Sequence, residues 1–557
     1  MIIAPWMPNP IREAFLLNSD LYPDAGSFDG DGLLCGLADS LAPSIIFKVS
    51  DLDRNSDVVV VDGWRRLLAE DFGGRVDRRP PEDPPKLGIL SQDLHMSEKT
   101  FQVAMLPWFA MGHLIPYINI SNKLAQRGHR ISFFIPTNTI PKFDHLNLHP
   151  DLITFIPVTV PHVDGLPHGA ETTADVSYVL HPLIVTAMDL TQPSIEASLK
   201  HLKPHFVFFD LAHWIPALAR RLGIKSVHYS VVSPAASAYL FVPARKLHEK
   251  QWAQSEFMKQ PPGYPASSIK LASYEARAPV ALGVNEFGSG ITFAERVSIS
   301  RSDCDAISFK TCTEIEGPFC DYIEKQYKKT VILAGPVMLD PPPAATLEER
   351  WEKWLGSFEP KTVIFCSFGS ECRLGKEQFQ ELVLGLELSG MPFFAALKPP
   401  LGVEKIENIL PTGFLERTQG RGIVYGGWVQ QQLILAHPSV GCNVTHCGYG
   451  SLLEAMINEC ELVLIPQYGD QIINSRLMSG DLEVGVEVER DKEDGLFTSE
   501  GLCKAIRLVT EVDSEVGKKV RANRAKLSEF LSRKSLDSSY IDSFVQKLQG
   551  LLGMTPP

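Results

Sequence analysis

The stretch Gly441–Glu454, GCNVTHCGYGSLLE, predicts a strand, a glycine turn and a helix in immediate succession. Gly441–His446 has the composition of a buried strand, Cys447–Gly450 forms the turn, and Ser451–Asn458 begins the helix. A helix that follows such a turn presents unpaired backbone N–H groups and the positive end of its dipole to an anion. The stretch therefore predicts a phosphate-binding unit of an α/β protein.

Strand-like and helix-like segments alternate on both sides of this unit, which predicts two tandem, doubly wound α/β domains that face each other across a cleft. The expected strands are 101–107, 130–135, 205–209, 226–229, 362–367, 393–396 and 422–425, and the expected helices are 114–127, 212–222 and 376–388. Ligands of such sheets bind at the carboxyl ends of the strands.

The proline run 341–343 marks the boundary between the two domains, because three consecutive prolines fit neither a helix nor a central strand. We expect an N-terminal acceptor-binding domain over 96–335, a linker over 336–349 and a C-terminal donor-binding domain over 350–557. The last helix of the chain is expected to pack back on the N-terminal domain.

Residues 1–95 differ in character from the rest and form an N-terminal extension of open status. They could be an artefact of the gene model, a disordered tail or a regulatory segment. Met96 is the expected functional start, since a short polar lead and then a buried strand follow it. A chain that begins there should keep full activity.

The composition of the chain excludes some classes of binding partner and indicates a cellular compartment. The net charge of −13 argues against nucleic acid or an anionic membrane. No apolar run reaches the ~18 residues that a membrane span needs, and Met1–Ala14 does not resemble a signal peptide. Ten cysteines without a Cys-x-x-Cys pair are typical of reduced thiols, so we expect a cytoplasmic protein. We also expect a monomer.

Five side chains around the turn have the chemistry that a nucleotide needs. His446 and Ser451 flank the turn and can donate hydrogen bonds to phosphate, and Glu454 can accept from vicinal ribose hydroxyls. Trp428 offers a flat face to a base, and Gln431 can pair with the edge of that base. Each element alone is common, but the set at this spacing is specific.

The segment Trp428–Gln471 resembles the signature box of the plant secondary-metabolite UDP-glycosyltransferases of family 1, and the similarity covers about residues 100–550. The resemblance implies the two-domain fold called GT-B and an inverting transfer of sugar from a UDP-sugar. It assigns these UDP-sugar-binding residues: Ser370, Trp428, Val429, Gln431, His446, Gly450, Ser451, Glu454, Asp470 and Gln471. By this resemblance Gln471 favours glucose or xylose, and rhamnose is a third candidate.

Three positions depart from the commonest pattern of the family: Gln430 replaces Pro, Tyr449 replaces Trp, and Gly450 replaces Asn. Gly450 can contribute only its backbone, which leaves the donor sugar open. The aromatic-Gly-Ser sequence after His-Cys-Gly is similar to the branch that extends a sugar already attached to a flavonoid. The implied acceptor is therefore a flavonoid or anthocyanin glycoside.

His113, in Met111-Gly-His-Leu-Ile-Pro116, is the expected general base, with Asp210 as its partner. A lone histidine is more often structural, but the family's base occupies this Gly-His-x-x-Pro position. The positive end of the following helix should keep the imidazole neutral near pH 7. His213, one turn further on, is expected in a helix or in the acceptor pocket.

No cofactor and no metal is expected. The Asp-x-Asp strings 29–31, 51–53 and 303–305 lie away from the phosphate loops, and a helix end plus His446 can neutralise the leaving diphosphate.

Three other functions are alternatives at the level of the sequence. They are glycosylation of a triterpenoid or another specialised-metabolite aglycone, a non-catalytic nucleotide-sugar or glycoside binder, and a nicotinamide-dependent oxidoreductase. The last lacks a Gly-x-Gly-x-x-Gly fingerprint after an early strand, and the retained His113 and Asp210 argue against a mere binder.

Overall fold

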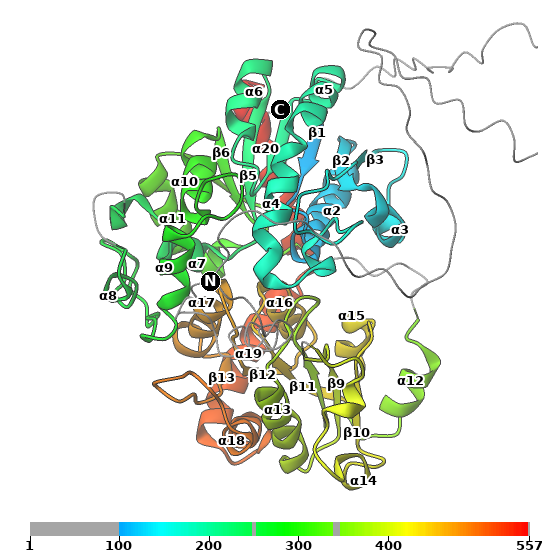
Figure 1. The fold of residues 1–557 in the computed structure, drawn as a ribbon. Helices are drawn as coiled ribbons and strands as arrows, with labels where there is room; N and C mark the ends of the chain where they lie inside the picture. Colours follow the sequence, from blue (N-terminus) through cyan, green and yellow to red (C-terminus); the bar gives the residue numbers. More distant parts are fainter. Residues whose placement is uncertain (1–99, 248–251, 338–345, 401, 555–557) are drawn as a thin grey trace, which may run out of the picture. The chain divides into compact units, whose positions relative to one another are not determined.

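The computed structural model describes residues 100–247, 252–337, 346–400 and 402–554, which belong to one compact unit. The extension 1–95, its two Asp-x-Asp strings and most of the proline linker lie outside the described residues. Figure 1 shows two sheets in the described part, each flanked by helices.

The first sheet has seven parallel strands in the order β3-β2-β1-β4-β5-β6-β7. Most of these strands are apolar runs buried on both faces, as is typical of a sheet covered by crossover helices. The strands are β1 Gln102–Leu106, β2 Arg130–Pro136, β3 Ile153–Val158, β4 Phe206–Phe209, β5 Lys225–Ser230, β6 Ala306–Phe309 and β7 Thr330–Leu333.

The helices that accompany the first sheet are α2 Met111–Ala125, α3 Ile140–Phe143, α4 His181–Leu190, α5 Gln192–Leu202, α6 Ile215–Leu222, α7 Pro234–Tyr239, α8 Gln254–Phe257, α9 Arg277–Val284, α10 Phe293–Asp303 and α11 Thr313–Tyr327.

The second sheet has six parallel strands in the order β10-β9-β8-β11-β12-β13. The strands are β8 Val363–Ser367, β9 Phe393–Ala396, β10 Gly422–Tyr425, β11 Val440–Thr445, β12 Glu461–Leu464 and β13 Gly485–Glu487. The helices are α12 Glu349–Leu355, α13 Lys376–Leu388, α14 Phe414–Arg417, α15 Gln431–Leu435, α16 Tyr449–Ile457, α17 Asp470–Arg476, α18 Ser499–Thr510, α19 Glu515–Leu531 and α20 Lys534–Leu551. The predicted fold class, two Rossmann-like halves, is confirmed.

In both sheets the strand order reverses beside a central strand. In the first sheet β1 lies between β2 and β4, and in the second β8 lies between β9 and β11. The loops after these neighbours leave in opposite directions and open a crevice at the carboxyl edge, where ligands of such sheets bind. This topology places the segments after β1, β4, β8 and β11 at candidate sites.

The last helix, α20, packs on the first sheet although it follows the second sheet in sequence. Ile541, Phe544 and Leu548 are buried in the same apolar cluster as strands β1 and β2, and the Phe544 ring lies 6.0 Å from that of Phe208. Arg127, just after α2, donates to Asp542 at 2.6 Å. These contacts join the end of the chain to its N-terminal half.

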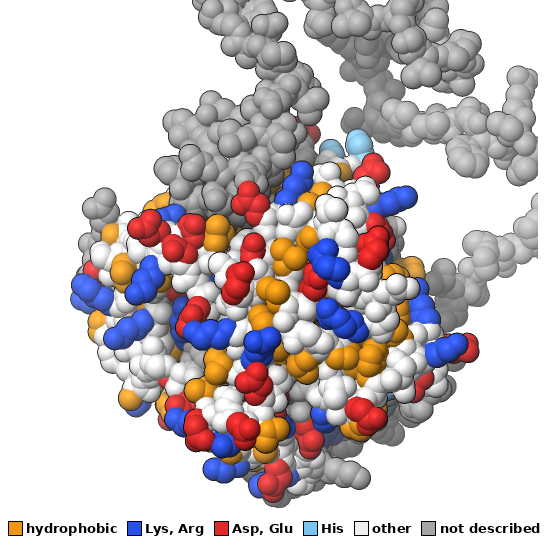
Figure 2. Space-filling view, turned by 90° about the horizontal axis from the view of Figure 1, so that it is seen from below, with side chains coloured by type: hydrophobic (Ala, Val, Ile, Leu, Met, Phe, Trp, Pro, Cys, Tyr) orange, Lys and Arg blue, Asp and Glu red, His pale blue; other side chains and the backbone are white. Residues whose placement is uncertain are grey.

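The face of the molecule seen in Figure 2 carries acidic and basic side chains interspersed with apolar ones. No helix among the described residues is long and apolar enough to cross a membrane.

Candidate active site

The first part of the site is a histidine–aspartate pair at the carboxyl edge of the first sheet. His113 lies in the first turn of α2, after β1, and Asp210 directly follows the adjacent strand β4. Nδ1 of His113 lies 2.6 Å from Oδ2 of Asp210. The backbone N–H groups of Trp108 and Leu211 donate to Oδ1 at 2.8 and 2.7 Å and fix the carboxylate. Since a carboxylate only accepts, Nδ1 carries the ring proton and Nε2 keeps its lone pair.

The pKa of His113 is raised above its usual value. Burial of the ring works against protonation, but the charge of Asp210, its hydrogen bond and the more distant Glu371 and Asp470 outweigh it. The sequence interpretation considered only the helix end, which disfavours the imidazolium, and did not include the carboxylates, which raise the pKa. A carboxylate in contact with the ring acts more strongly than a partial helix charge.

The turn after β11 is shorter than predicted. Cys447 adopts a left-handed φ of 68° and Gly448 caps α16, which begins at Tyr449 and not at Ser451. A chain reversal at Cys447 leaves only one further residue before the helix. Gly450 and Ser451 thus lie in the first helical turn, where backbone N–H groups are unpaired. A Cβ added at Gly450 would meet nothing within 4 Å, so the space beside this turn is open.

Two loops approach each other around the ring of His446. A Cβ at Gly369, in the loop after β8, would lie 3.0 Å from the ring, and one at Gly448 would lie 2.8 Å from Nε2. Gly369 also has a φ of 71°, so a side chain here would be strained as well as crowded. Ser370 follows it and is exposed in the same loop. Burial lowers the pKa of His446 to about 4, so the ring is neutral at pH 7 and donates from one nitrogen.

The expected base-binding residue is the most solvent-exposed aromatic side chain of the site. Trp428 is 76% exposed, whereas Val429 beside it is buried. A large apolar ring that is left in water offers area for a planar ligand to cover.

Glu454 is the centre of a hydrogen-bond network on the donor side. The side-chain amides of Gln431 and Gln432 donate to its two carboxylate oxygens at 2.7 and 3.2 Å. Gln431 also donates to Ser451 at 3.3 Å and accepts from Ser367 at 2.9 Å. Each oxygen of Glu454 has a further lone pair, so the carboxylate can also accept from a diol.

Asp470 and Gln471 begin α17, after the left-handed Gly469. Asn474, one turn on, donates to Asp470 at 3.0 Å and to the Cys447 carbonyl at 3.1 Å. Gln471 accepts from the backbone N–H of Gln467 at 3.1 Å, which orients its amide. Asp470 lies close enough to His113 for each to shift the pKa of the other, so the structure brings the predicted sugar-binding carboxylate toward the predicted base.

Sequence reasoning missed a buried link between the two halves. The Tyr449 hydroxyl contacts Oε2 of Glu316 at 2.6 Å and Oγ1 of Thr311 at 2.8 Å. The Glu316 side chain is fully buried, and it also accepts from Thr311 at 2.8 Å and from the Ala235 backbone at 3.0 Å. Tyr449, a departure from the family pattern, thus ties the first turn of α16 to α11. No local pattern could have shown this contact, because its partners are 133 residues apart.

A second missed group is Glu371, which accepts from the hydroxyl of Thr173 at 2.6 Å across the two halves. Its position directly after Ser370, in the predicted phosphate loop, could have indicated from the sequence that Glu371 belongs to the site. Its charge contributes to the raised pKa of His113.

The third Asp-x-Asp string has a structural role. Asp305 accepts from the backbone and hydroxyl of Ser226 at 2.9 and 3.0 Å and pairs with Lys225. No group of three or more His, Cys, Asp or Glu side chains in the described ranges is arranged to hold a metal ion.

Residues 339–530 match the family model described as UDP-glucoronosyl and UDP-glucosyl transferase. The chain is 58% identical over 458 residues, 82% of its length, to the whole of the cyanidin 3-O-galactoside 2''-O-xylosyltransferase FGGT1 of Actinidia chinensis var. chinensis. It is 54% identical over 454 residues, 82% of its length and 99% of the relative, to the anthocyanidin 3-O-glucoside 2''-O-glucosyltransferase of Ipomoea nil.

Among solved structures, the chain is similar to Glycyrrhiza uralensis UGT73P12 complexed with glycyrrhetinic acid 3-O-monoglucuronide. The TM-score is 0.68 at 21% identity, over 81% of this chain and 96% of that one. At this identity the likeness concerns the fold alone.

Proposed function

We propose, from the premise that the chain belongs to the UDP-glucoronosyl and UDP-glucosyl transferase family, that it extends the sugar of a flavonoid glycoside with inversion. By their names, the two relatives transfer a sugar to the 2''-oxygen of a cyanidin or anthocyanidin 3-O-glycoside. The corresponding acceptor here is the 2''-hydroxyl of a flavonoid 3-O-glycoside. The donor is UDP-glucose or UDP-xylose, since one relative transfers each sugar.

The single observation that carries the mechanism is the contact between His113 and Asp210. Nε2 of His113 accepts the proton of the acceptor hydroxyl while the oxygen attacks the anomeric carbon of the donor sugar. The bond from that carbon to the diphosphate breaks, and UDP leaves from the opposite face. Asp210 stabilises the imidazolium that forms.

The C-terminal half supports this proposal with hydrogen-bond donors for the diphosphate, on which negative charge develops as the bond breaks. The N–H groups at the start of α16 and the neutral ring of His446 can donate to its oxygens. Glu454 and Trp428 suit the ribose and the base, and Asp470 and Gln471 suit the hydroxyls of the transferred sugar.

His113→Ala is expected to lower turnover by about 10²–10⁴ while UDP affinity stays unchanged. The test combines UDP-glucose, UDP-xylose and UDP-rhamnose with a panel of flavonoid 3-O-glycosides, their aglycones and triterpenoids, with product mass as the readout and calorimetry for UDP. Unchanged turnover would remove His113 from the role, and transfer to aglycones alone would refute the proposed acceptor. UDP binding without any product would favour a non-catalytic binder.

We expect the reaction to need no metal, because the N–H groups at the helix end and the neutral ring of His446 can donate hydrogen bonds to the leaving diphosphate. Turnover is therefore expected to be the same within about twofold after dialysis against EDTA, with and without added Mg²⁺ or Mn²⁺. A loss that Mg²⁺ restores would contradict this proposal.

We also propose a monomer that works in the cytoplasm. The nine cysteines within the described residues are all free thiols, which suits a reducing compartment. Light scattering after gel filtration would test the monomer, and a fluorescent fusion would test the compartment.

A further inference from the structure

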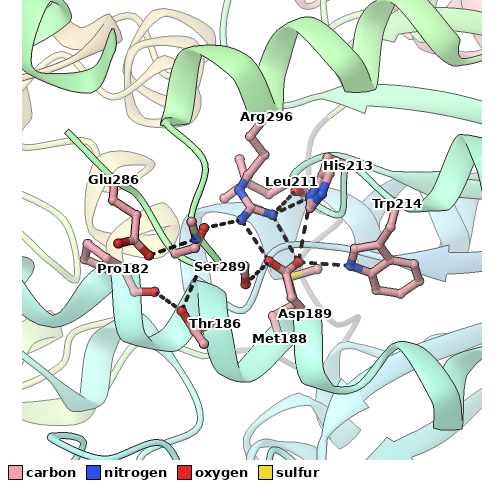
Figure 3. Close-up of polar contacts among 12 residues, drawn as sticks. Pro182, Thr186, Met188, Asp189, Leu211, His213, Trp214, Glu286, Ser289 and Arg296 are labelled. Atoms are coloured by element: carbon pink, nitrogen blue, oxygen red, sulfur yellow. Dashed lines mark hydrogen bonds and ion pairs between the residues drawn. The ribbon is translucent and has the colours of Figure 1, made fainter. Parts of the chain in front are cut away.

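A largely buried charged cluster, drawn in Figure 3, contacts the loop that follows β4 and takes no part in the mechanism above. Its centre is the ion pair of Arg296, on α10, with Asp189, on α4: the two guanidinium nitrogens donate to the two carboxylate oxygens at 3.0 and 2.8 Å. Trp214 Nε1 and the Ser289 hydroxyl donate to the same carboxylate at 2.9 and 2.7 Å. Asp189 therefore accepts four hydrogen bonds.

The ion pair fixes the tautomer of a histidine. The Nη1 atom of Arg296 lies 2.8 Å from Nδ1 of His213. A guanidinium can only donate, so Nδ1 must accept and Nε2 carries the ring proton. Asp189 lies 3.9 Å from Nδ1, too far for a hydrogen bond, and cannot reverse this assignment.

The ring of His213 is partly open to solvent at the carboxyl edge of the first sheet, the edge at which ligands of such sheets bind. The side chain is 22% exposed, against 1% for Arg296 and 10% for Asp189, so the ring is the accessible end of the cluster. His213 belongs to the loop at the carboxyl end of β4, three residues after Asp210, and three residues span at most about 11 Å. Within the described residues, Nε2 makes no hydrogen bond. Burial and the charge of Arg296 lower the pKa of His213, which keeps the ring neutral.

We infer that His213 is a specificity-determining residue for the acceptor, whose Nε2–H donates a hydrogen bond to a hydroxyl or ether oxygen of the glycoside that is extended. Arg296 and Asp189 are positioning residues that act through His213. The inference rests on the proposed function, because it takes the acceptor to be a glycoside. The two histidines at this edge then have different roles. Nε2 of His113 accepts the proton of the acceptor hydroxyl, and Nε2–H of His213 orients the acceptor glycoside.

The test measures binding and not turnover. Calorimetry with the UDP-saturated protein and a flavonoid 3-O-glucoside should show about three- to tenfold weaker binding for His213→Phe, the loss of one neutral hydrogen bond. His213→Gln, which keeps an N–H donor, should bind within about threefold of the wild type. UDP affinity should be unchanged in both variants. Arg296 retains Asp189 and the Leu211 carbonyl at 3.3 Å in these variants, and thermal unfolding checks their folding.

His205→Phe is the matched control. Nδ1 of His205 also accepts from a donor, the Gln102 backbone at 3.0 Å, but this histidine precedes β4 at the opposite end of the strand. Its substitution should leave the affinity for the glucoside unchanged. Equal affinities in the wild type and His213→Phe would overturn the inference while wild-type transfer activity upheld the proposed function. Failure of the wild type to bind any flavonoid glycoside would overturn both.

An independent readout is the tautomer itself. In ¹⁵N-histidine spectra of the whole protein, the signals lost in His213→Phe should show a protonated Nε2 and an unprotonated Nδ1 at pH 7. Arg296→Lys, which cannot hold the ring and the carboxylate in one planar fork, should weaken this preference. A protonated Nδ1 in the wild type would overturn the inference.

Discussion

At the scale of single residues, neighbouring side chains decide what two similar histidines can do. Asp210 accepts from Nδ1 of His113, whereas Arg296 donates to Nδ1 of His213. The same ring is thereby a proton acceptor in one place and a hydrogen-bond donor in the other. Function at this edge of the sheet depends on the partners as much as on the histidines.

The pH dependence of the reaction should follow His113. Burial alone would lower the pKa of this ring, but the charge of Asp210 and the more distant carboxylates raise it above the usual value. A general base acts only when it is deprotonated, so kcat/KM should fall as the pH falls through this pKa and level off above it. In Asp210→Asn the inflection should move to lower pH and the plateau should drop by about 10²–10⁴. Identical inflections in the two pH–rate profiles would contradict this assignment.

At the scale of elements, the boundaries that differ from expectation are those that matter for the site. Helix α6 begins at Ile215, with Pro216 in its first turn, and not at Ala212. Proline suits the first turn because its missing N–H would be unpaired there anyway. The residues before it form a loop, so His213 reaches the edge of the sheet from a loop and not from a helix.

The start of β1 should make folding sensitive to acid. His129 stacks on Phe101 at 3.8 Å between ring centroids, and its Nδ1 accepts from the Phe101 backbone at 3.3 Å. Burial and Arg127 lower the pKa of His129 to about 4, below the usual value of about 6.5 in an unfolded chain. The stability from this group is complete above pH 6.5 and is lost as the pH falls toward 4. At pH 5 the loss is on the order of 2 kcal/mol.

His129→Gln keeps an acceptor but cannot titrate. Urea unfolding at pH 7 and pH 5 should show that the wild type loses about 2 kcal/mol more than the variant over this range. His446, whose pKa is also lowered to about 4, titrates in both proteins and cancels in the comparison. Parallel losses in the two proteins would contradict the assignment.

At the scale of the whole molecule, the proposed base His113 and the proposed phosphate site at the start of α16 belong to different halves, so their relative placement depends on contacts between the halves. Tyr449 connects the first turn of α16 to Glu316 on α11. Asn474, which contacts Asp470, also accepts from Ser233, the cap of α7. These buried links join the donor side to helices of the first half.

Tyr449→Phe should therefore lower kcat by about tenfold while the UDP affinity changes by less than about twofold, because a small misplacement of the two halves costs rate and not donor contacts. It should also destabilise the fold by about 1–3 kcal/mol, since a buried carboxylate loses a partner. The measurements are steady-state kinetics, UDP calorimetry and urea unfolding.

Tyr327→Phe is the matched control for this prediction. It also removes a buried hydroxyl on a tyrosine, one that donates to the Phe241 carbonyl at 2.7 Å, but both partners lie in the first half. It should reduce stability and leave kcat unchanged. Equal effects of the two variants on kcat would refute a role for Tyr449 in placing the halves.

The sequence by itself determined the two-sheet fold and the family and predicted the donor-binding residues, because buried parallel strands and crossover helices have local periodicities and most of the predicted residues lie close together in the chain. The tertiary structure decided which way the pKa of His113 moves, which nitrogen of His213 carries the proton, and which residues join the halves. Those outcomes depend on contacts such as His113 with Asp210, Arg296 with His213 and Tyr449 with Glu316. Their members lie far apart along the chain, and no local pattern of hydropathy or charge encodes which of them meet.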